Sequence, residues 1–461
     1  MNKANNITIT LACIAAPNLA FFCVASYFDL NRPWLNLDYS IVVLLFSFGW
    51  RKAGALALLI AMVLDCLALL TQLLPFSRIA DLIYLASFLP SASTYHITVI
   101  SLASLTIALI FTSSVKLNRH ASKMTALVAL NIAVLVQIIF SASMAPEAEN
   151  DTSYRKAVEG PVYSQGLNLY RMRSNIFLEM FEDQKVTLKK IAPGATASTF
   201  EALDKGAAPE RILLIVSESW GVPKNDSVQA ALLAPLEKVR NSTYSYGTFR
   251  RAGFTIDGEL RELCRTRPSH FNLSNVNSGF ENCLPNLLDA RGYHTAAMHG
   301  ASGLMYNRLA WYPKVGFDET YFFENLSWHR RCYSFPGACD LDLFDNVKAY
   351  FGKPGKKFFY WLTLNSHSSY DPRDIEVEYL DCEQLGIRKK TESCRNLQLH
   401  AQFFHGLAAL LQTNELRDVE VIVVGDHTPV ILDQAEKSAY FLDRAIPWIK
   451  LPPIPAAATI R

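Results

Sequence analysis

Residues 211–220 have the sequence RILLIVSESW, an apolar run that passes directly into polar residues. Two later stretches have the same form, FFYWLT at 358–363 and VEVIVV at 419–424. Runs of this kind are typical of strands buried on both faces of a mostly parallel sheet. Segments with helical periodicity, such as 282–291 and 398–413, lie between them. This part of the chain is therefore predicted to be an α/β domain that binds ligands at the carboxyl ends of its strands.

Polar residues follow the first and the last of these apolar runs. Glu218 comes soon after the first run, and Asp426 and His427 come soon after the last. A lone glutamate at a strand end is usually solvated or caps the next helix, whereas an Asp-His pair after a buried strand is more specific. Together, these carboxylates and the imidazole suit a divalent ion such as Zn or Mn. The sequence therefore predicts a metal site.

The segment FTIDGE at 254–259 precedes a helical run that ends at Cys264. The Thr255 hydroxyl would then lie at the N-terminus of a helix, where unpaired N–H groups stabilise a phosphoryl oxygen. A neighbouring metal ion lowers the pKa of such a hydroxyl, so Thr255 is a candidate nucleophile. Spacing alone favours the simpler alternative that Thr255 is only an N-cap.

The rest of the chain is apolar enough to contain membrane spans. The whole chain has 461 residues, of which 50% are hydrophobic, and its mean hydropathy is +0.12. A net charge of +2 with 19% charged residues does not indicate a nucleic-acid-binding surface. Candidate spans are 7–28, 34–50, 53–75, 95–115 and 124–143. The predicted organisation is a transmembrane domain at 1–143, a linker with helices at 144–209 and an extracytoplasmic catalytic domain at 210–461.

Basic residues between the spans indicate the orientation. With a cytoplasmic N-terminus, only Arg32 and Arg78 lie in short outer loops, as the positive-inside rule requires. The inner loops hold Lys3, Arg51, Lys52, Lys116, Arg119 and Lys123. Five spans then place everything after Ser143 outside. Asp65, within the third span, is either functional or hydrogen-bonded to a neighbouring helix.

Six of the nine cysteines fall in the polar half of the chain. An even number in one region indicates disulfides in an oxidising compartment. Free thiols in a cytosolic enzyme are the alternative, and the absence of a C-x-x-C pair argues against a zinc cluster. Proximity in sequence suggests the pairs Cys264–Cys283, Cys332–Cys339 and Cys382–Cys394.

The glutamate after the first strand, the threonine before a helix and the terminal Gly-Asp-His resemble the alkaline phosphatase/sulfatase superfamily. The chain is most similar to its membrane branch, which comprises lipoteichoic acid synthase, the periplasmic phosphoglycerol transferases and the phosphoethanolamine transferases. These proteins join about five spans to an external sulfatase-like domain. MHG at 298–300, YNR at 306–308, GFD at 316–318 and LTLNSH at 362–367 resemble the lipoteichoic acid synthase motifs. The segment from Thr255 to Cys264 resembles the nucleophile segment of the phosphoglycerol transferases.

The resemblance implies a role for each motif residue. Glu218, Thr255, Asp426 and His427 would bind one metal ion, with Thr255 also the nucleophile. His299, Tyr306, Arg308 and His367 would line the phosphate and head-group pocket. Arg308 offers a fork of donors for a phosphate, although it could instead bridge to Asp318. The two histidines could donate to phosphoryl oxygens or protonate the leaving alkoxide.

Two departures from the family pattern bear on function. Tyr306 replaces the family's tryptophan, which leaves the head group open between phosphoglycerol and phosphoethanolamine. The C/S-x-P-x-R motif of true sulfatases is absent, which argues against sulfate-ester hydrolysis. We therefore expect transfer of one of these groups from a phospholipid donor to a surface glycan or lipid through a phospho-threonine. The resemblance implies a multi-pass protein of the bacterial inner membrane with a periplasmic catalytic domain. A phosphodiesterase of the same superfamily and a catalytically silent scaffold for polysaccharide export are the alternatives.

Overall fold

A computed structural model shows a chain of two compact units, Met1–Glu179 and Met180–Arg461. Residues 79–93 are too few and too rich in serine and proline to span a membrane, so the sequence predicts that they lie at its interface; this stretch lies outside the residues that the structure describes. So does the apolar patch at 176–181, apart from Met180. The described residues are 3–27, 30–73, 94–143, 158, 160–173, 180, 185–192, 194–239, 244–251, 253–368, 370–431 and 433–454.

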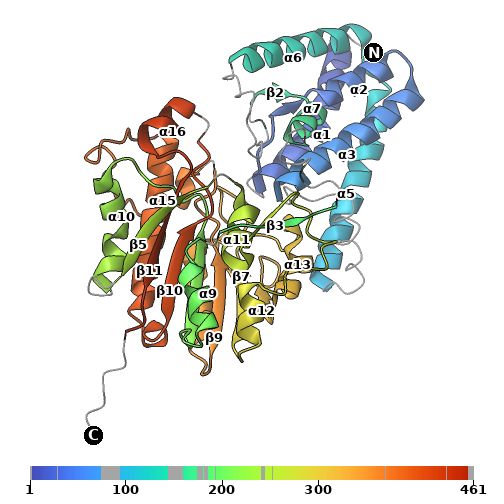
Figure 1. The fold of residues 1–461 in the computed structure, drawn as a ribbon. Helices are drawn as coiled ribbons and strands as arrows, with labels where there is room; N and C mark the ends of the chain where they lie inside the picture. The colour runs from blue at the N-terminus through green and yellow to red at the C-terminus, as the bar shows by residue number, and fades with distance from the viewer. Residues whose placement is uncertain are drawn as a thin grey trace. The chain divides into compact units, whose positions relative to one another are not determined.

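The first unit is mainly helical (Figure 1). Its helices are α1 (Lys3–Tyr27), α2 (Asp38–Ser47), α3 (Arg51–Leu73), α5 (Thr94–Asn118), α6 (Lys123–Ser143) and α7 (Gln165–Arg173). A two-stranded parallel pair joins β1 (Leu35–Asn36) to β2 (Val162–Tyr163). Within the described part of the chain, four helices are long and apolar enough to cross a membrane, namely α1, α3, α5 and α6.

The second predicted span, 34–50, is not a long helix. It contains α2, which has 10 residues and rises about 15 Å, roughly half the thickness of a bilayer core. The preceding residues are extended because their polar groups bond to neighbouring helices. Asn31 exchanges two hydrogen bonds with the Gln72 side chain near the end of α3. The segment from Asn31 to Trp50 therefore runs beside α3 in the opposite direction, with helical backbone over part of its length only.

Asp65 of α3 lies at the centre of a buried polar cluster. Its carboxylate accepts hydrogen bonds from Arg32 Nε at 3.0 Å and Nη2 at 2.7 Å. Tyr39 Oη donates at 3.1 Å and Gln165 Nε2 at 2.9 Å. These donors come from the segment before α2, from α2 itself and from α7. Of the two roles considered for Asp65, the structure shows hydrogen bonding to its neighbours.

Removing this carboxylate should destabilise the first unit. Asp65→Ala leaves the Arg32 charge buried without a partner, which costs about 3–5 kcal/mol. Thermal unfolding of the full chain in detergent micelles measures the loss. The matched variant, Arg32→Met with Asp65→Ala, removes both charges and should recover most of it. Equal destabilisation in the single and double variants would contradict this account.

The second unit contains a seven-stranded sheet in the order β5-β11-β10-β4-β9-β7-β8. Its strands are β5 (Ser245–Arg250), β11 (Ala445–Leu451), β10 (Glu420–Gly425), β4 (Arg211–Ser217), β9 (Lys357–Leu362), β7 (His294–His299) and β8 (Glu319–Tyr321). All run the same way except β11. The three apolar runs identified in the sequence form β4, β9 and β10, which confirms the α/β prediction. A separate antiparallel pair joins β3 (Leu188–Lys190) to β6 (Thr266–Pro268).

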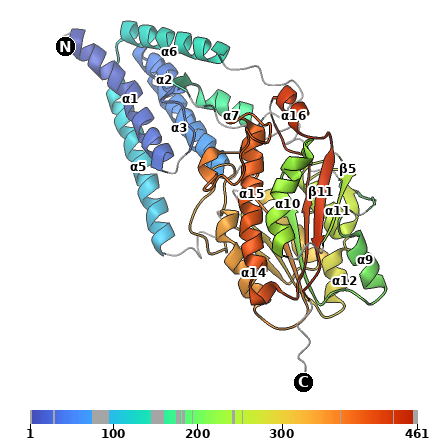
Figure 2. The ribbon, with the colours of Figure 1, turned by 90° about the vertical axis from the view of Figure 1, so that its left-hand side faces the viewer.

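Helices cover both faces of this sheet (Figure 2). The helices of this unit are α9 (Ala197–Asp204), α10 (Asp226–Val239), α11 (Thr255–Cys264), α12 (Leu284–Asp289), α13 (Arg308–Val315), α14 (Phe344–Phe351), α15 (Glu392–Leu411) and α16 (Gln434–Tyr440). Alternate strand residues, such as Ile215 and Trp361, pack in one core with α10, α14 and α15. Tyr360, the residue before Trp361 on β9, points to the opposite face and reaches α11. The sheet therefore lies between two helical layers, and its strand ends stay open for a site.

All three predicted disulfides form. They join Cys264 to Cys283, Cys332 to Cys339 and Cys382 to Cys394. Among the described residues, the free cysteines are Cys13, Cys23 and Cys66, all in the first unit. Disulfides persist in oxidising compartments, so their confinement to the second unit supports an extracytoplasmic location for that unit.

Candidate functional site

The centre of the site lies where β4 and β10 end together. Ser217 pairs with Gly425 across these neighbouring parallel strands, so the residues that follow them meet. One ligand atom from each of Glu218, Asp426 and His427 lies within 4.8 Å of the others, and all three residues are buried. Two strand ends that are distant in sequence thus bring together the carboxylates and the imidazole that the sequence singled out.

Thr255 points into this group from the first turn of α11. Its Oγ1 donates to Glu218 Oε2 at 3.2 Å and lies 3.5 Å from His427 Nε2. The helix can come this close because Gly258 has no side chain, and a Cβ there would lie 2.7 Å from that of Asp426. The N-cap of α11 is Phe254, whose N–H donates to Asp257. The Thr255 hydroxyl therefore faces the candidate ligands and does not cap the helix.

His427 is held in the tautomer that a metal ligand needs. Its Nδ1 lies 2.9 Å from the Thr428 carbonyl oxygen. Because a carbonyl can only accept, Nδ1 carries the proton and donates. Nε2 then faces Glu218 Oε1 and Asp426 Oδ2, each at 3.3 Å. A backbone acceptor that fixes the ring in this way is typical of histidines that bind metals.

The two carboxylates and the imidazole strongly affect one another's protonation. Burial and the negative charge of Glu218 raise the pKa of Asp426 to about 8. Burial opposes protonation of His427, but the two carboxylates outweigh it and raise the pKa of the imidazole to about 10. Burial also opposes ionisation of Glu218, yet its hydrogen bond to His427 and the charge of that ring lower the pKa of the carboxyl. Protons on Asp426 and His427 thus offset the buried negative charge.

These residues fit a divalent metal ion. Asp426 Oδ1 accepts from the N–H groups of Ser219 and His427, at 2.7 and 2.6 Å. Its Oδ2 is buried and accepts no hydrogen bond from any residue that the structure describes. An oxygen of this kind, beside a second carboxylate and an imidazole nitrogen, is a suitable ligand for Zn or Mn. A bound cation would replace the two protons that otherwise balance the charge.

His299 ends β7 and lies against the neighbouring strand. Its Nδ1 donates to the Leu362 carbonyl oxygen at 3.0 Å. Burial and the charge of Arg308 lower the pKa of His299 well below its usual range. The ring is therefore neutral, and its Nε2 can accept a hydrogen bond. Contrary to our expectation that His299 donates to a phosphoryl oxygen, this arrangement suits an acceptor for a substrate hydroxyl.

Tyr306 and Arg308 lie at the start of α13. Tyr306 is buried, and its side chain lies beside that of Thr255. The Arg308 guanidinium donates from Nη2 to Glu259 Oε2 at 2.7 Å and from Nε at 3.2 Å. The fork that we expected to meet a phosphate is therefore occupied by a glutamate. Asp318, the alternative partner considered for Arg308, instead accepts from Thr295.

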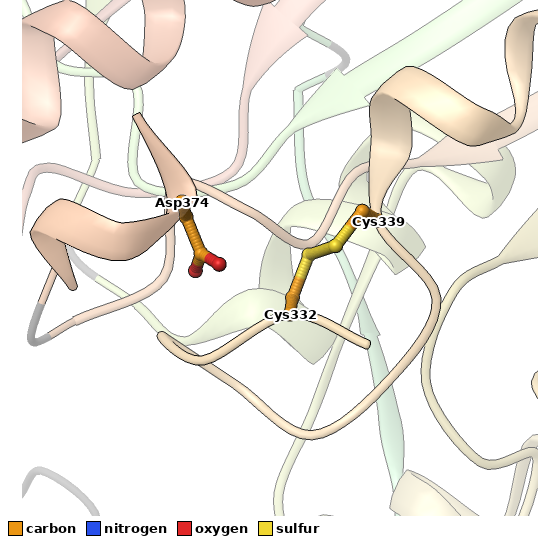
Figure 3. A group of neighbouring side chains, drawn as sticks. All are labelled: Cys332, Cys339 and Asp374. Carbon is orange, nitrogen blue, oxygen red and sulfur yellow. A yellow bond between two sulfur atoms is a disulfide. The ribbon is translucent and has the colours of Figure 1, made fainter. Parts of the chain in front are cut away.

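His367 follows β9 and is supported by a disulfide-closed loop. Its Nδ1 donates to the Ser368 carbonyl oxygen at 2.6 Å, and its ring centroid lies 4.4 Å from that of Phe335. The Cys332–Cys339 disulfide closes the loop that carries Phe335. Figure 3 shows this disulfide beside Asp374. The Asp374 carboxylate accepts from the N–H groups of residues 333 and 334. Since the two sulfur atoms are bonded to each other, these three residues stabilise the loop and do not form a second metal centre.

Comparison with known families agrees with this geometry. The sequence model described as Sulfatase matches residues 211–445, just over half of the chain. The chain belongs to the sulfatase family. This membership confirms the predicted relationship to the alkaline phosphatase superfamily. No curated protein matches the chain in sequence.

Several solved structures resemble this sulfatase-family chain. Lipoteichoic acid synthase LtaP from Listeria monocytogenes is 20% identical, with 54% of this chain and 67% of that chain covered and a TM-score of 0.41. Phosphoglycerol transferase GacH from Streptococcus pyogenes, in complex with sn-glycerol-1-phosphate, is 17% identical, with coverages of 56% and 74% and a TM-score of 0.39. The C-terminal periplasmic domain of EcEptC from Escherichia coli, in complex with Zn, is 12% identical, with coverages of 53% and 73% and a TM-score of 0.36.

Two residues of this sulfatase-family site were not identified from the sequence. Glu259, the partner of Arg308, is one helical turn after Thr255, a spacing that places both on the same face of α11. That spacing was the available signal. Phe335 lies between two cysteines whose pairing we predicted, but no sequence pattern connects it to His367. Contacts between separate loops of this kind depend on the tertiary fold.

Metal binding should release protons. Because the pKa values of Asp426 and His427 are about 8 and about 10, both groups carry a proton at neutral pH. Binding of Zn or Mn should therefore release about two protons per ion, and the affinity should rise with pH. Titration calorimetry of the full chain in buffers of different ionisation enthalpy gives the number directly. Binding without proton release would contradict this account of the site.

Proposed function

We propose that this protein transfers a phosphoglycerol or phosphoethanolamine group from a phospholipid to a surface glycan or lipid through a phospho-Thr255 intermediate. The observation that carries the proposal is the Thr255 hydroxyl, 3.2 Å from Glu218 and 3.5 Å from His427. A hydroxyl among metal ligands at a helix N-terminus is arranged to attack phosphorus. The long apolar helices of the same chain would keep the site near a lipid donor.

In the first step, Thr255 Oγ1 attacks the phosphorus of the donor. The hydroxyl proton leaves towards Glu218 Oε2, to which Thr255 already donates. An Oγ1–P bond forms, and the bond between phosphorus and the diacylglycerol oxygen breaks. When bound, the metal ion would lower the pKa of the Thr255 hydroxyl and stabilise the charge on the phosphoryl oxygens. The N-terminus of α11, where Thr255 lies, would favour the negative charge on the same oxygens.

His367 and His299 have different proposed roles in this step. The Nδ1 of His367 donates to Ser368, so its Nε2 is the atom that would carry a proton to the diacylglycerol alkoxide. His299 is neutral, and its Nε2 would accept a hydrogen bond from the transferred head group. In the second step, an acceptor hydroxyl attacks phosphorus and gives its proton to His367 Nε2, the Oγ1–P bond breaks, and Glu218 returns its proton to Thr255 Oγ1.

We place this catalytic unit in the bacterial periplasm. Its three disulfides support an oxidising compartment. Residues 31–50 run the length of α3, so this segment and the four long helices together would cross the membrane five times. Backbone that is not helical is tolerated at membrane depth where it is buried in protein, and Arg32 and Asn36 of this segment are buried. Five crossings carry the chain from a cytoplasmic N-terminus to the opposite side.

Mass spectrometry of Thr255 tests the proposal. The full chain, loaded with Zn or Mn, would be incubated with vesicles of phosphatidylglycerol or phosphatidylethanolamine. We expect an adduct on Thr255 whose mass identifies the head group, and its transfer when a glycan is added. Release of the group to water alone, with a glycan present, would indicate a phosphodiesterase. No adduct from either lipid would contradict the proposal.

A further inference from the structure

Glu259 and Arg308 form a fully buried ion pair beside the nucleophile. The exposed fractions of their side chains are 0% and 1%. Besides the two Arg308 donors, the Glu259 carboxylate accepts from Tyr312 Oη at 2.5 Å and Tyr360 Oη at 3.2 Å. Glu259 thus joins α11 to two further elements, namely α13, through Arg308 and Tyr312, and the strand β9, through Tyr360. A carboxylate satisfied by four donors holds its surroundings in one geometry.

The backbone next to Arg308 adopts an unusual conformation. Tyr306 and Asn307 both have positive φ values, 52° and 54°. Residues other than glycine keep such a conformation only where neighbouring groups enforce it. Arg308 lies over the Tyr306 ring at 5.0 Å, and Trp311 Nε1 donates to the Tyr306 carbonyl oxygen at 3.0 Å. The side chains of α13 therefore hold the Tyr306 ring in place.

The Tyr306 ring reaches the nucleophile. Its side chain lies beside that of Thr255. Its ring centroid lies 5.7 Å from that of Phe271, which lies 5.0 Å from the ring of Phe254, the residue before Thr255. Thr255 and Glu259 belong to the same helix, α11. The contacts form a closed loop, which runs from Thr255 along α11 to Glu259, then to Arg308, to Tyr306 and back to Thr255. Since each link is buried, a change at Glu259 is transmitted to the Thr255 hydroxyl.

We propose that the Glu259–Arg308 ion pair is a positioning device that holds Tyr306 against Thr255, and that Arg308 does not contact the substrate. The inference rests on Thr255 being the nucleophile, and it goes beyond that function by giving these two residues a role. Glu259 becomes a positioning residue, as does Arg308. An ordered hydroxyl attacks phosphorus faster, because small displacements of a reacting atom strongly reduce the rate.

The proposal and direct phosphate binding by Arg308 predict different kinetics. Loss of a contact made equally in the ground state and the transition state raises KM and leaves kcat unchanged. Loss of nucleophile positioning lowers kcat and leaves KM nearly unchanged. The two residues should also behave as one unit, so removing both should cost no more than removing either.

The test uses bis-p-nitrophenyl phosphate with the Mn-loaded full chain. The variants are Glu259→Gln, Arg308→Met and the two combined, and the readouts are metal content, KM and the burst of nitrophenol that accompanies formation of the Thr255 adduct. We expect each of the three to lower the burst rate by about 100-fold, with KM and metal content close to those of the wild type. Arg211→Met is the matched control, because that arginine pairs with Asp418 at the far end of β4 and should have little effect.

A normal burst rate in Glu259→Gln, or a raised KM with normal kcat in Arg308→Met, would overturn the proposal. A loss of burst rate in the combined variant that equals the product of the two single losses would also overturn the proposal. If the charge variants do not fold, Tyr312→Phe removes a single hydroxyl from Glu259 and should lower the burst rate by about threefold to tenfold. A normal rate in that variant would overturn it as well. This test does not require a phospholipid, because the substrate is an activated diester. If wild-type protein reacts with the diester but with neither phospholipid, the proposed function is wrong, while the positioning role of Glu259 and Arg308 is still tested.

Discussion

Thr255→Ala should reduce transfer from phospholipid by roughly 10⁴-fold or more, and no adduct should form at position 255. The Oγ1 atom lies among the candidate metal ligands at the N-terminus of α11, and in the proposed mechanism it forms the covalent intermediate. The variant should still fold and bind metal, because Glu218, Asp426 and His427 keep their positions. Transfer of a radiolabelled head group from lipid to a glycan measures the loss of activity. Metal content measured on the same sample shows whether the metal site is intact.

Thr255→Ser is the control for this substitution. Serine keeps the hydroxyl at the start of α11 and should retain the adduct, with a rate within about tenfold of the wild type because only a methyl group is lost. Ile256→Val, one position further along the same helix, tests whether small changes in packing there affect the rate. Transfer at the wild-type rate by Thr255→Ala would rule out the phospho-threonine mechanism.

The cluster of Glu218, Asp426 and His427 could be predicted because it depends on strand ends. β4 and β10 are continuous apolar runs since both faces of the sheet are covered by helices, so their limits are visible in the sequence. Parallel neighbours end at the same edge, which brings Glu218 close to Asp426 although more than 200 residues separate them. The disulfides were predicted for a simpler reason, because each cysteine pairs with its nearest neighbour in the polar half.

The partner of Arg308 could not be predicted in this way. Nothing in the sequence around Glu259 shows whether this residue is buried with four hydrogen-bond donors or is a solvated glutamate on a helix. The pairing depends on how α11 packs against α13 and β9, a tertiary property. The resemblance implied the role of Arg308 as a phosphate ligand, and its fork of donors agreed with that role, but a guanidinium suits a buried carboxylate as well as it suits a phosphate.

The second span illustrates a different limit. Hydropathy averages over a window, so 34–50 is apolar enough to suggest a helix that crosses the bilayer. Arg32 and Asn36 change the outcome, because their side chains bond to Asp65 and draw the backbone ahead of α2 into the helical unit. A few buried polar contacts thus replace several turns of helix. The described residues therefore contain four long apolar helices where the sequence predicted five spans.

Asp426→Asn should weaken metal binding by at least about 100-fold and reduce transfer accordingly. Losing a metal ligand lowers the affinity more than losing a residue that only hydrogen-bonds to a ligand, which costs about 10–100-fold. The amide keeps an oxygen for the N–H groups of Ser219 and His427, so the local backbone should stay in place. It replaces Oδ2 with an NH₂ group, which cannot bind a metal. Metal content after dialysis, together with the transfer rate at rising Mn concentration, measures both effects.

The same substitution should change how the metal-free protein responds to pH. In the folded chain the pKa of Asp426 is about 8, against 3.8 as its ordinary value, so the folded state binds a proton that the unfolded state has lost. His427 acts in the same direction, since its pKa rises from 6.5 to about 10. Stability of the metal-free wild type should therefore fall as pH rises from about 5 to about 8. Asp426→Asn removes the first contribution and weakens the second, so its unfolding temperature should change less.

Two comparisons make this result specific to the site. Asp418→Asn alters an exposed carboxylate that pairs with Arg211 at the opposite end of the sheet, so it should keep the metal content and pH dependence of the wild type. Saturation with Zn should reverse the trend in the wild type, because the ion replaces the two protons and binds more tightly as pH rises. Equal pH dependence of metal-free wild type and Asp426→Asn would show that the buried carboxylate is already ionised without metal. The charge balance derived for Glu218, Asp426 and His427 would then be wrong.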